Sequence, residues 1–166
     1  MKFRQAGSAW LGAGFYDLQQ DKKEEILSWL KAKQFVQVIR GSLIVSYFHA
    51  FHALYQAWLA LQEQRLIAKS FQLEILLRAA GTRQVDDALD YAGLKEREKL
   101  VCLVAVEQEK EKLEQLEQEF CRLFSAKETS PRPEKRLLQQ VFGSDREAVI
   151  ITRIALLNLE SNARKS

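Results

Sequence analysis

Two histidines are the first residues of this sequence whose type and spacing could do chemistry. His49 and His52 are three residues apart in a segment with helical spacing, and this separation can place two imidazoles on one metal ion. The sequence has no other histidine, and neither cysteine is close to the pair along the chain. Histidines among aromatic residues more often pack or form hydrogen bonds. The pair therefore predicts no metal site.

Patterns typical of enzymes are incomplete. Gly12-Ala-Gly14 has two glycines of a dinucleotide-binding loop, but it lacks the third and the strand-to-helix turn. Asp86, Asp87 and Asp90 fall in the first turns of an expected helix, where acidic side chains complement the helix dipole. The sequence has neither a Walker loop nor a nucleophile elbow. We therefore expect a noncatalytic protein with no cofactor and no small-molecule substrate.

Two expected helix starts carry cations. Lys69 precedes Ser70, which can cap one helix, and Arg83 follows Thr82, which can cap the next. Free backbone N–H groups beside a cation can bind phosphate. Arg78 lies one turn before the second start, but it is also four residues after Glu74 and could pair with it on the surface. The residues alone leave both phosphate binding and ordinary surface charge open.

Composition restricts the class of protein. The 166 residues are 47% hydrophobic and 28% charged, which is typical of a globular domain and excludes a disordered or collagen-like chain. The net charge of +3 says little about partners. The most apolar stretch, Leu43 to Leu61, contains two serines, two histidines and a glutamine, so we expect no membrane span. The first residues contain no apolar signal-peptide core, so we expect a cytoplasmic protein.

The spacing of apolar side chains predicts the helices and strands that position the residues described above. Strands are expected over 1–6, 35–39 and 100–106, the last of them a continuous apolar run in the sheet interior. Helices are expected over 21–30, 46–62, 70–80, 82–92, 108–124, 134–141 and from 144 onward. The helix over 46–62 is expected to be the most buried, with Trp58 enclosed. The segment containing Gly7, Gly12 and Gly14 and the segment 125–133 are expected to be loops.

These elements predict an α+β fold, with helices packed on a small mixed β-sheet. One domain is expected over 1–160, followed by a polar, basic tail over 161–166. Gly93 with Leu94 is typical of a Schellman helix end. Cys102 and Cys121 are expected to be two reduced thiols.

The segment from Lys69 to Leu94 resembles a known family. Its basic-Ser start, its Glu-Ile-Leu helix, its Gly81-Thr-Arg-Gln84 turn and its Ala-Leu pair are similar to the signature of the small accessory subunit of the KEOPS tRNA-modification complex. This is the family of the PRPK-binding protein TPRKB, and the sequence looks most like its archaeal members. Val85 and Leu94 depart mildly from the family's isoleucines. The resemblance is specific from about Phe35 to Val106.

The resemblance implies a noncatalytic subunit that binds and stimulates the Bud-type kinase-like ATPase of KEOPS. It also implies that the subunit helps the complex to hold tRNA by its 3′ CCA end for threonylcarbamoyladenosine synthesis, which a separate Kae-type subunit carries out. We expect RNA contacts from the cations and the amide near the two helix starts and from the tail: Lys69, Arg78, Arg83, Gln84, Arg164 and Lys165. A protein-interaction adaptor that regulates a kinase without RNA, and an enzyme whose site one sequence does not reveal, stay open.

The last helix suggests where the kinase binds. Ile150, Ile151 and Ile154 cannot all point inward, because consecutive helix residues are rotated by about 100°. We therefore expect Ile151 in an exposed apolar patch, beside Leu76 or Leu77, that a partner covers.

Overall fold

The computed structural model describes the backbone of residues 1–163 and the side chains of residues 1–158. Its centre is a five-stranded sheet with the order β1-β2-β4-β3, in which β5 also pairs with β2. The strands are β1 (Lys2–Ala6), β2 (Ala9–Asp17), β3 (Val36–Arg40), β4 (Leu100–Glu107) and β5 (Lys127–Thr129). Every pair is antiparallel, so the α+β class is confirmed but the mixed sheet is wrong. The connection between β3 and β4 is long enough for either direction, and sequence spacing does not choose between them.

Strand β4 is the buried interior strand that its apolar run predicted. It lies between β2 and β3, and all its residues except Glu107 are buried. Its side chains alternate between two cores, with Cys102 and Val104 in one and Val101 and Leu103 in the other. Burial raises the pKa of the Cys102 thiol, as expected for a structural cysteine.

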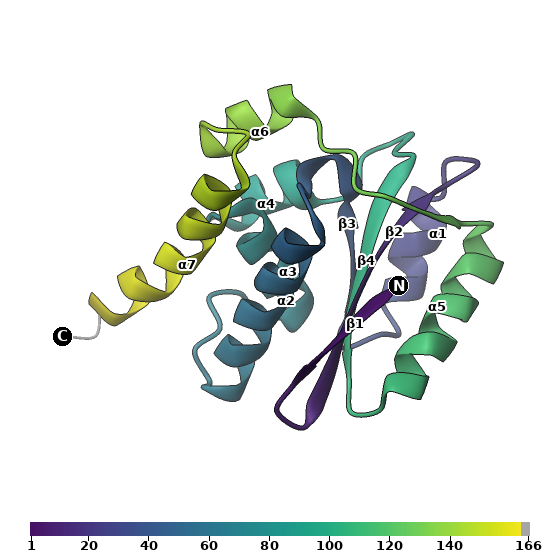
Figure 1. The fold of residues 1–166 in the computed structure, drawn as a ribbon, viewed down its shortest axis with the longest axis horizontal. Helices are drawn as coiled ribbons and strands as arrows, with labels where there is room; N and C mark the ends of the chain where they lie inside the picture. The colour runs from purple at the N-terminus through teal and green to yellow at the C-terminus, as the bar shows by residue number, and fades with distance from the viewer. Residues whose placement is uncertain (164–166) are drawn as a thin grey trace.

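Helices cover both faces of this sheet (Figure 1). On one side are α2 (Tyr47–Gln62), α3 (Phe71–Ala80), α4 (Val85–Ala92), α6 (Lys135–Phe142) and α7 (Glu147–Ala163). On the other side are α1 (Lys23–Leu30) and α5 (Lys110–Phe124). A short 3-10 turn, η1 (Gly41–Leu43), follows β3. Two hydrophobic cores result, one on each face of the sheet.

The glycine-containing segment after β1 is a strand rather than the predicted loop. Gly12 and Gly14 lie within β2, on the face that α5 covers. A Cβ atom at Gly14 would come within 2.3 Å of the Tyr16 hydroxyl, and one at Gly12 within 3.3 Å of Leu113. The glycines therefore allow other groups to pack closely against β2, which is one reason why glycine occurs inside strands.

The helix ends agree with the predictions only in part. Ser70 is the predicted cap and accepts a hydrogen bond from the Leu73 amide, and Ser46 caps α2 in the same way by accepting one from the His49 amide. The cap predicted at Thr82 is shifted, because Gln84 is the N-cap of α4. Gly93 has φ −67° and is extended, so the Schellman prediction is wrong. The left-handed helix end is at Gly81, where φ is +61°.

The most buried helix is α3, not α2. Eight of the ten residues of α3 are buried, whereas Phe48 and Tyr55 of α2 are exposed. Trp58 is half-buried, with its ring against Phe35 and Phe71. In the part of the chain that the structure describes, no helix combines the length and apolar character needed to cross a membrane.

Candidate functional site

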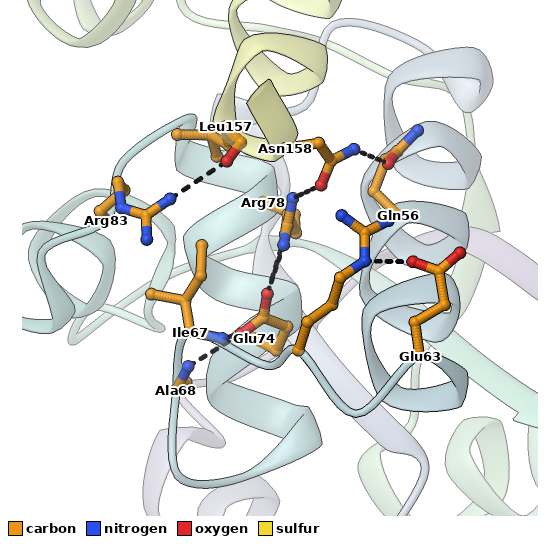
Figure 2. A network of polar contacts seen from close by, with 10 residues as sticks. Gln56, Glu63, Ile67, Ala68, Glu74, Arg78, Arg83, Leu157 and Asn158 are labelled. Atoms are coloured by element: carbon orange, nitrogen blue, oxygen red, sulfur yellow. Dashed lines mark hydrogen bonds and ion pairs between the residues drawn. The ribbon is translucent and has the colours of Figure 1, made fainter. Parts of the chain in front are cut away.

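A buried polar network joins the predicted phosphate-binding segment to the last helix (Figure 2). Glu74 and Arg78 of α3 form an ion pair of 2.7 Å, and their side chains are 0% and 1% exposed. The second carboxylate oxygen of Glu74 accepts hydrogen bonds from the amides of Ile67 and Ala68, at 2.7 and 2.9 Å. The carboxylate therefore holds the loop between α2 and α3 against the start of α3, next to Lys69.

The same arginine reaches α7. Arg78 donates to the Asn158 side-chain carbonyl at 2.5 Å, and the Asn158 amide donates to Gln56 of α2 (Figure 2). This burial corrects two expectations. The Glu74–Arg78 pair exists but is not on the surface, and Arg78 cannot contact RNA from this position. An arginine that is itself buried and has side-chain partners on α3 and α7 is a packing residue.

Lys69 is exposed beside a cleft of about 280 Å³ between α1, α3 and α4. We call this the α3–α4 cleft, and it is lined by Leu27, Leu30, Lys31, Gln37, Val38, Ser70, Gln72, Leu73, Leu76, Leu89, Gly93 and Leu94. Lys31 is the only charged side chain among the described lining residues, and Leu27 and Leu89 are exposed at 39% and 46%. Sequence analysis missed Lys31, because only the tertiary fold brings α1 beside the start of α3.

Arg83 and Gln84 lie at the opposite end of α3 from Lys69. The helix has ten residues, which is about 15 Å. Gln84 is exposed, while Arg83 is half-buried and donates to the Leu157 carbonyl of α7 at 3.1 Å. The predicted RNA residues are therefore not brought together at one point. Arg164 and Lys165 lie outside the described residues.

The exposed residues of helix α7 between Ala148 and Leu156 include one charged side chain, Arg153. Ile150 and Ile154 are fully buried and Ile151 is half-buried, so Ile151 is the least buried of the three isoleucines but is not exposed as predicted. Beside Ile151, the outer face consists of exposed small and apolar residues: Ala148, Val149, Thr152, Ala155 and Leu156. Leu76 and Leu77 are 4% and 0% exposed, so the expectation that they share an exposed patch with Ile151 is wrong. They lie on the helix that the rest of the chain encloses.

Comparison with known proteins decides the family. The family model described as "Kinase binding protein CGI-121" matches residues 15–157, which is most of the chain. This chain belongs to that family. The resemblance predicted from Lys69 to Leu94 is thereby confirmed.

A curated relative of this CGI-121 family member is the "Regulatory protein Cgi121" of Methanocaldococcus jannaschii, which is 36% identical over 73 residues. The aligned region covers 44% of this chain and 46% of the relative. The chain thus matches about half the length of that protein.

The histidines of this CGI-121 family member do not form a metal site with each other. His49 accepts a hydrogen bond from the Val45 amide through Nδ1 and donates through Nε2 to the Ala79 carbonyl, at 3.3 and 3.0 Å. Burial lowers the pKa of His49 to about 4, so the ring is neutral at physiological pH. The prediction that a histidine here forms structural hydrogen bonds is confirmed for His49. No group of three or more metal-ligating side chains lies together in the described residues.

Proposed function

We propose that this CGI-121 family member is a noncatalytic, cytoplasmic subunit of a KEOPS complex. It binds and stimulates the Bud-type kinase-like ATPase, and it helps to recruit tRNA by the 3′ CCA end for threonylcarbamoyladenosine synthesis. Membership in a kinase-binding family supports the kinase partner. The printed name of the archaeal relative, a regulatory protein, supports a regulatory rather than an enzymatic role.

The outer face of α7 is the observation that carries kinase docking. An amphipathic surface helix normally presents charged or polar residues to water. From Ala148 to Leu156 the only charged residue of α7 is Arg153, which is exposed and whose guanidinium donates to the carbonyls of Gly81 and Val141. A face of this composition loses little when a partner covers it, and the kinase gains apolar contact area.

The test of kinase docking is Ile151→Glu. A carboxylate at the centre of an apolar interface would be desolvated without a partner, so we expect affinity for the kinase-like ATPase to fall at least about 100-fold. The matched control is Leu123→Glu on α5, where a 48% exposed leucine lies on the other side of the molecule. Isothermal titration calorimetry should separate them, with circular dichroism confirming that both variants fold. Equal affinity of the two variants would contradict docking on α7.

The α3–α4 cleft carries the tRNA part of the proposal. Lys31 lines the cleft, exposed Lys69 stands next to its lining residue Ser70, and no described lining residue is acidic. Leucines at the rim offer apolar surface to an unpaired base, and single-stranded RNA ends expose both bases and phosphates. We assign Lys69 and Lys31 to phosphates of the 3′ end and Gln84 to a more distant base or ribose edge. Arg83 then acts by holding its turn against α7.

The test uses tRNA with and without the CCA end. Lys69→Glu and Lys31→Glu should weaken binding of intact tRNA and reduce its salt dependence, since fewer counterions are released. The control is Lys127→Glu. Lys127 is an exposed residue of β5, which pairs with β2, whereas the cleft lies beside β3 at the other side of the sheet. Truncated tRNA should be less sensitive to the first two substitutions. Unchanged tRNA affinity and salt slope would leave the alternative function, an adaptor that regulates a kinase without RNA.

A further inference from the structure

A second cleft lies on the molecule away from both proposed surfaces. It measures about 370 Å³ and is bounded by Arg4, Gln5, Ala6 and Gly7 on one side. Leu11 of β2 forms part of its floor, and helix α2 supplies the other wall with Phe48, Phe51, His52 and Tyr55. None of these residues belongs to the α3–α4 cleft or to the outer face of α7.

The lining shows that this cleft follows the backbone of β1. Side chains of consecutive strand residues point to opposite faces of a sheet. Arg4 and Ala6 share the face of β1 that α2 covers, and because Gln5 and Gly7 also border the cleft, it reaches the outer edge of β1 and the turn after it. Strand β1 ends the strand order, and among the described strands it pairs only with β2. The edge beside the cleft is therefore open.

The register identifies the peptide groups on that edge. Ala6 is opposite Ala9 across a two-residue turn that begins with Gly7 at φ +64°. A turn of this kind pairs the residues that flank it, and antiparallel partners then alternate between bonded and non-bonded pairs. The N–H and C=O groups of Gln5 and Phe3 consequently point away from β2. They are a template for another strand.

The opposite wall of the cleft offers side-chain contacts. Phe48 and Tyr55 are 48% and 40% exposed, which is unusual for aromatic residues that flank a cleft. His52 Nε2 is the one buried side-chain nitrogen or oxygen in the described residues that lacks a hydrogen-bond partner. Native proteins seldom leave such an atom unpaired. A rotation of the imidazole would offer it to a peptide group in the cleft.

Charge selects the occupant. The guanidinium of Arg4 lies 5.1 Å from the centre of the Phe51 ring, on the side of β1 that faces α2, and no described lining residue is acidic. We propose that the β1 edge and this cleft bind an extended peptide segment of a partner protein as a sixth strand. On the face of the sheet that carries Arg4, this peptide segment presents a large apolar or aromatic side chain and, two residues away, an acidic side chain. The apolar side chain contacts Phe48 and Tyr55, while the carboxylate pairs with Arg4.

A nucleotide is a weaker candidate for the same cleft. It could stack on an aromatic ring, but it cannot pair with both the N–H and C=O groups of alternate residues along an open edge. Main-chain pairing plus pockets for alternate side chains is the usual arrangement when a strand is added to a sheet. This inference is independent of kinase and tRNA binding.

The test titrates the labelled full-length protein with acetylated heptapeptides in which Phe, Trp or Leu stands two residues before Glu and the other positions are Thr. We expect saturable binding below about 1 mM, with amide shifts at Phe3 and Gln5 in NMR spectra. N-methylation of one alternate set of peptide residues should abolish binding, whereas methylation of the other set should not. Replacing the peptide Glu by Lys should weaken binding at least tenfold.

Variants of the protein separate the edge from the aromatic wall. Gln5→Pro removes an outward N–H without removing a bond to β2, so it should abolish binding while the hairpin persists. Phe48→Ser should weaken binding at least tenfold, and Leu123→Ser, which replaces an equally exposed residue on α5, should not. If Gln5→Pro unfolds the hairpin, Tyr55→Glu tests the wall alone. Ile151→Glu should leave the affinity for the peptide unchanged. A failure of the kinase-docking proposal can therefore be told apart from a failure of this one. Absence of binding, equal tolerance of both N-methylated sets, or competition by AMP would overturn the proposal.

Discussion

Helices α5 and α7 pack on opposite sides of the molecule (Figure 1), and their outer faces differ in charge. The outer residues of α5 form ion pairs along the helix, such as Lys110 with Glu114 at 3.0 Å. Such pairs contribute little stability, but they keep a surface solvated. The corresponding face of α7 is small and apolar. The difference supports our proposal that a partner covers α7 rather than α5.

The two helices are also attached differently. Helix α5 is held by apolar side chains such as Phe120, which contacts the rings of Tyr16 and Phe124, and by part-buried hydrogen bonds from Tyr16 to Glu117 and from Trp29 to Glu119. Helix α7 buries Ile150, Ile154 and Leu157 and adds the polar link from Asn158 to Arg78. A helix that combines a core face with a partner face has less apolar area for its own attachment, and the buried network supplements it.

Arg78→Leu should have the largest effect on this comparison. The substitution leaves the fully buried Glu74 carboxylate without its cation, so we expect a loss of about 3–5 kcal/mol in the free energy of unfolding. Replacing both partners, Glu74→Leu with Arg78→Leu, should cost less than Arg78→Leu alone, because no charge is then left buried. Urea denaturation measures both. A loss below about 1 kcal/mol for Arg78→Leu would show that the network does not hold α7.

The pH dependence of stability should differ between the two sides. On the α7 side, the pKa of His49 falls from 6.5 in the unfolded chain to about 4 because of burial. Between these values the unfolded state binds the extra proton, so this contribution is complete above pH 6.5 and is lost as the pH falls to 4. Its size is on the order of 3 kcal/mol. On the α5 side, the indole of Trp29 donates to Glu119 and lowers the pKa of that carboxylate below 4.5, so its contribution is lost only at lower pH.

Denaturant titrations at several pH values between 4 and 7 test this order. The free energy of unfolding of the wild type should decrease as the pH is lowered from 7 to 4. The His49→Gln variant has no titrating ring at this position, so its free energy of unfolding should depend less on pH, whatever its absolute value. Glu119→Gln should change the profile only below about pH 4.5. A His49→Gln profile parallel to the wild type would mean that the buried ring does not titrate as its surroundings require.

The sequence predicted features whose cause is local. The apolar run of β4 and the serine cap of α3 each depend on residues within one strand or one helical turn. The burial of Arg78 could not be predicted, because its partner Asn158 lies 80 residues away. The strand at Gly12 and Gly14 was missed because glycines are typical of loops, whereas here a Cβ atom would come within 2.5 Å of the Met1 sulfur or 2.3 Å of the Tyr16 hydroxyl. Family resemblance located the important segment but not which of its cations face solvent.

The smallest effect on stability is expected when an exposed leucine on the outer face of α5 or α7 is replaced by lysine. Leu156 of α7 and Leu123 of α5 are both 48% exposed. Leu156→Lys and Leu123→Lys should each change the free energy of unfolding by no more than about 0.5 kcal/mol, since surface substitutions away from buried features seldom do more. Urea denaturation of the isolated protein should therefore not distinguish the two helices.

Binding of the kinase-like ATPase should distinguish them. Leu156→Lys places a charge on the face that we assign to the kinase, so affinity should fall at least about tenfold, mostly through faster dissociation. Leu123→Lys should leave the affinity unchanged, because the surface around it is already charged. Surface plasmon resonance gives both the affinity and the dissociation rate. Since the two leucines match in type and exposure, an equal loss for both variants would mean that the composition of a helix's outer face does not mark where the partner binds.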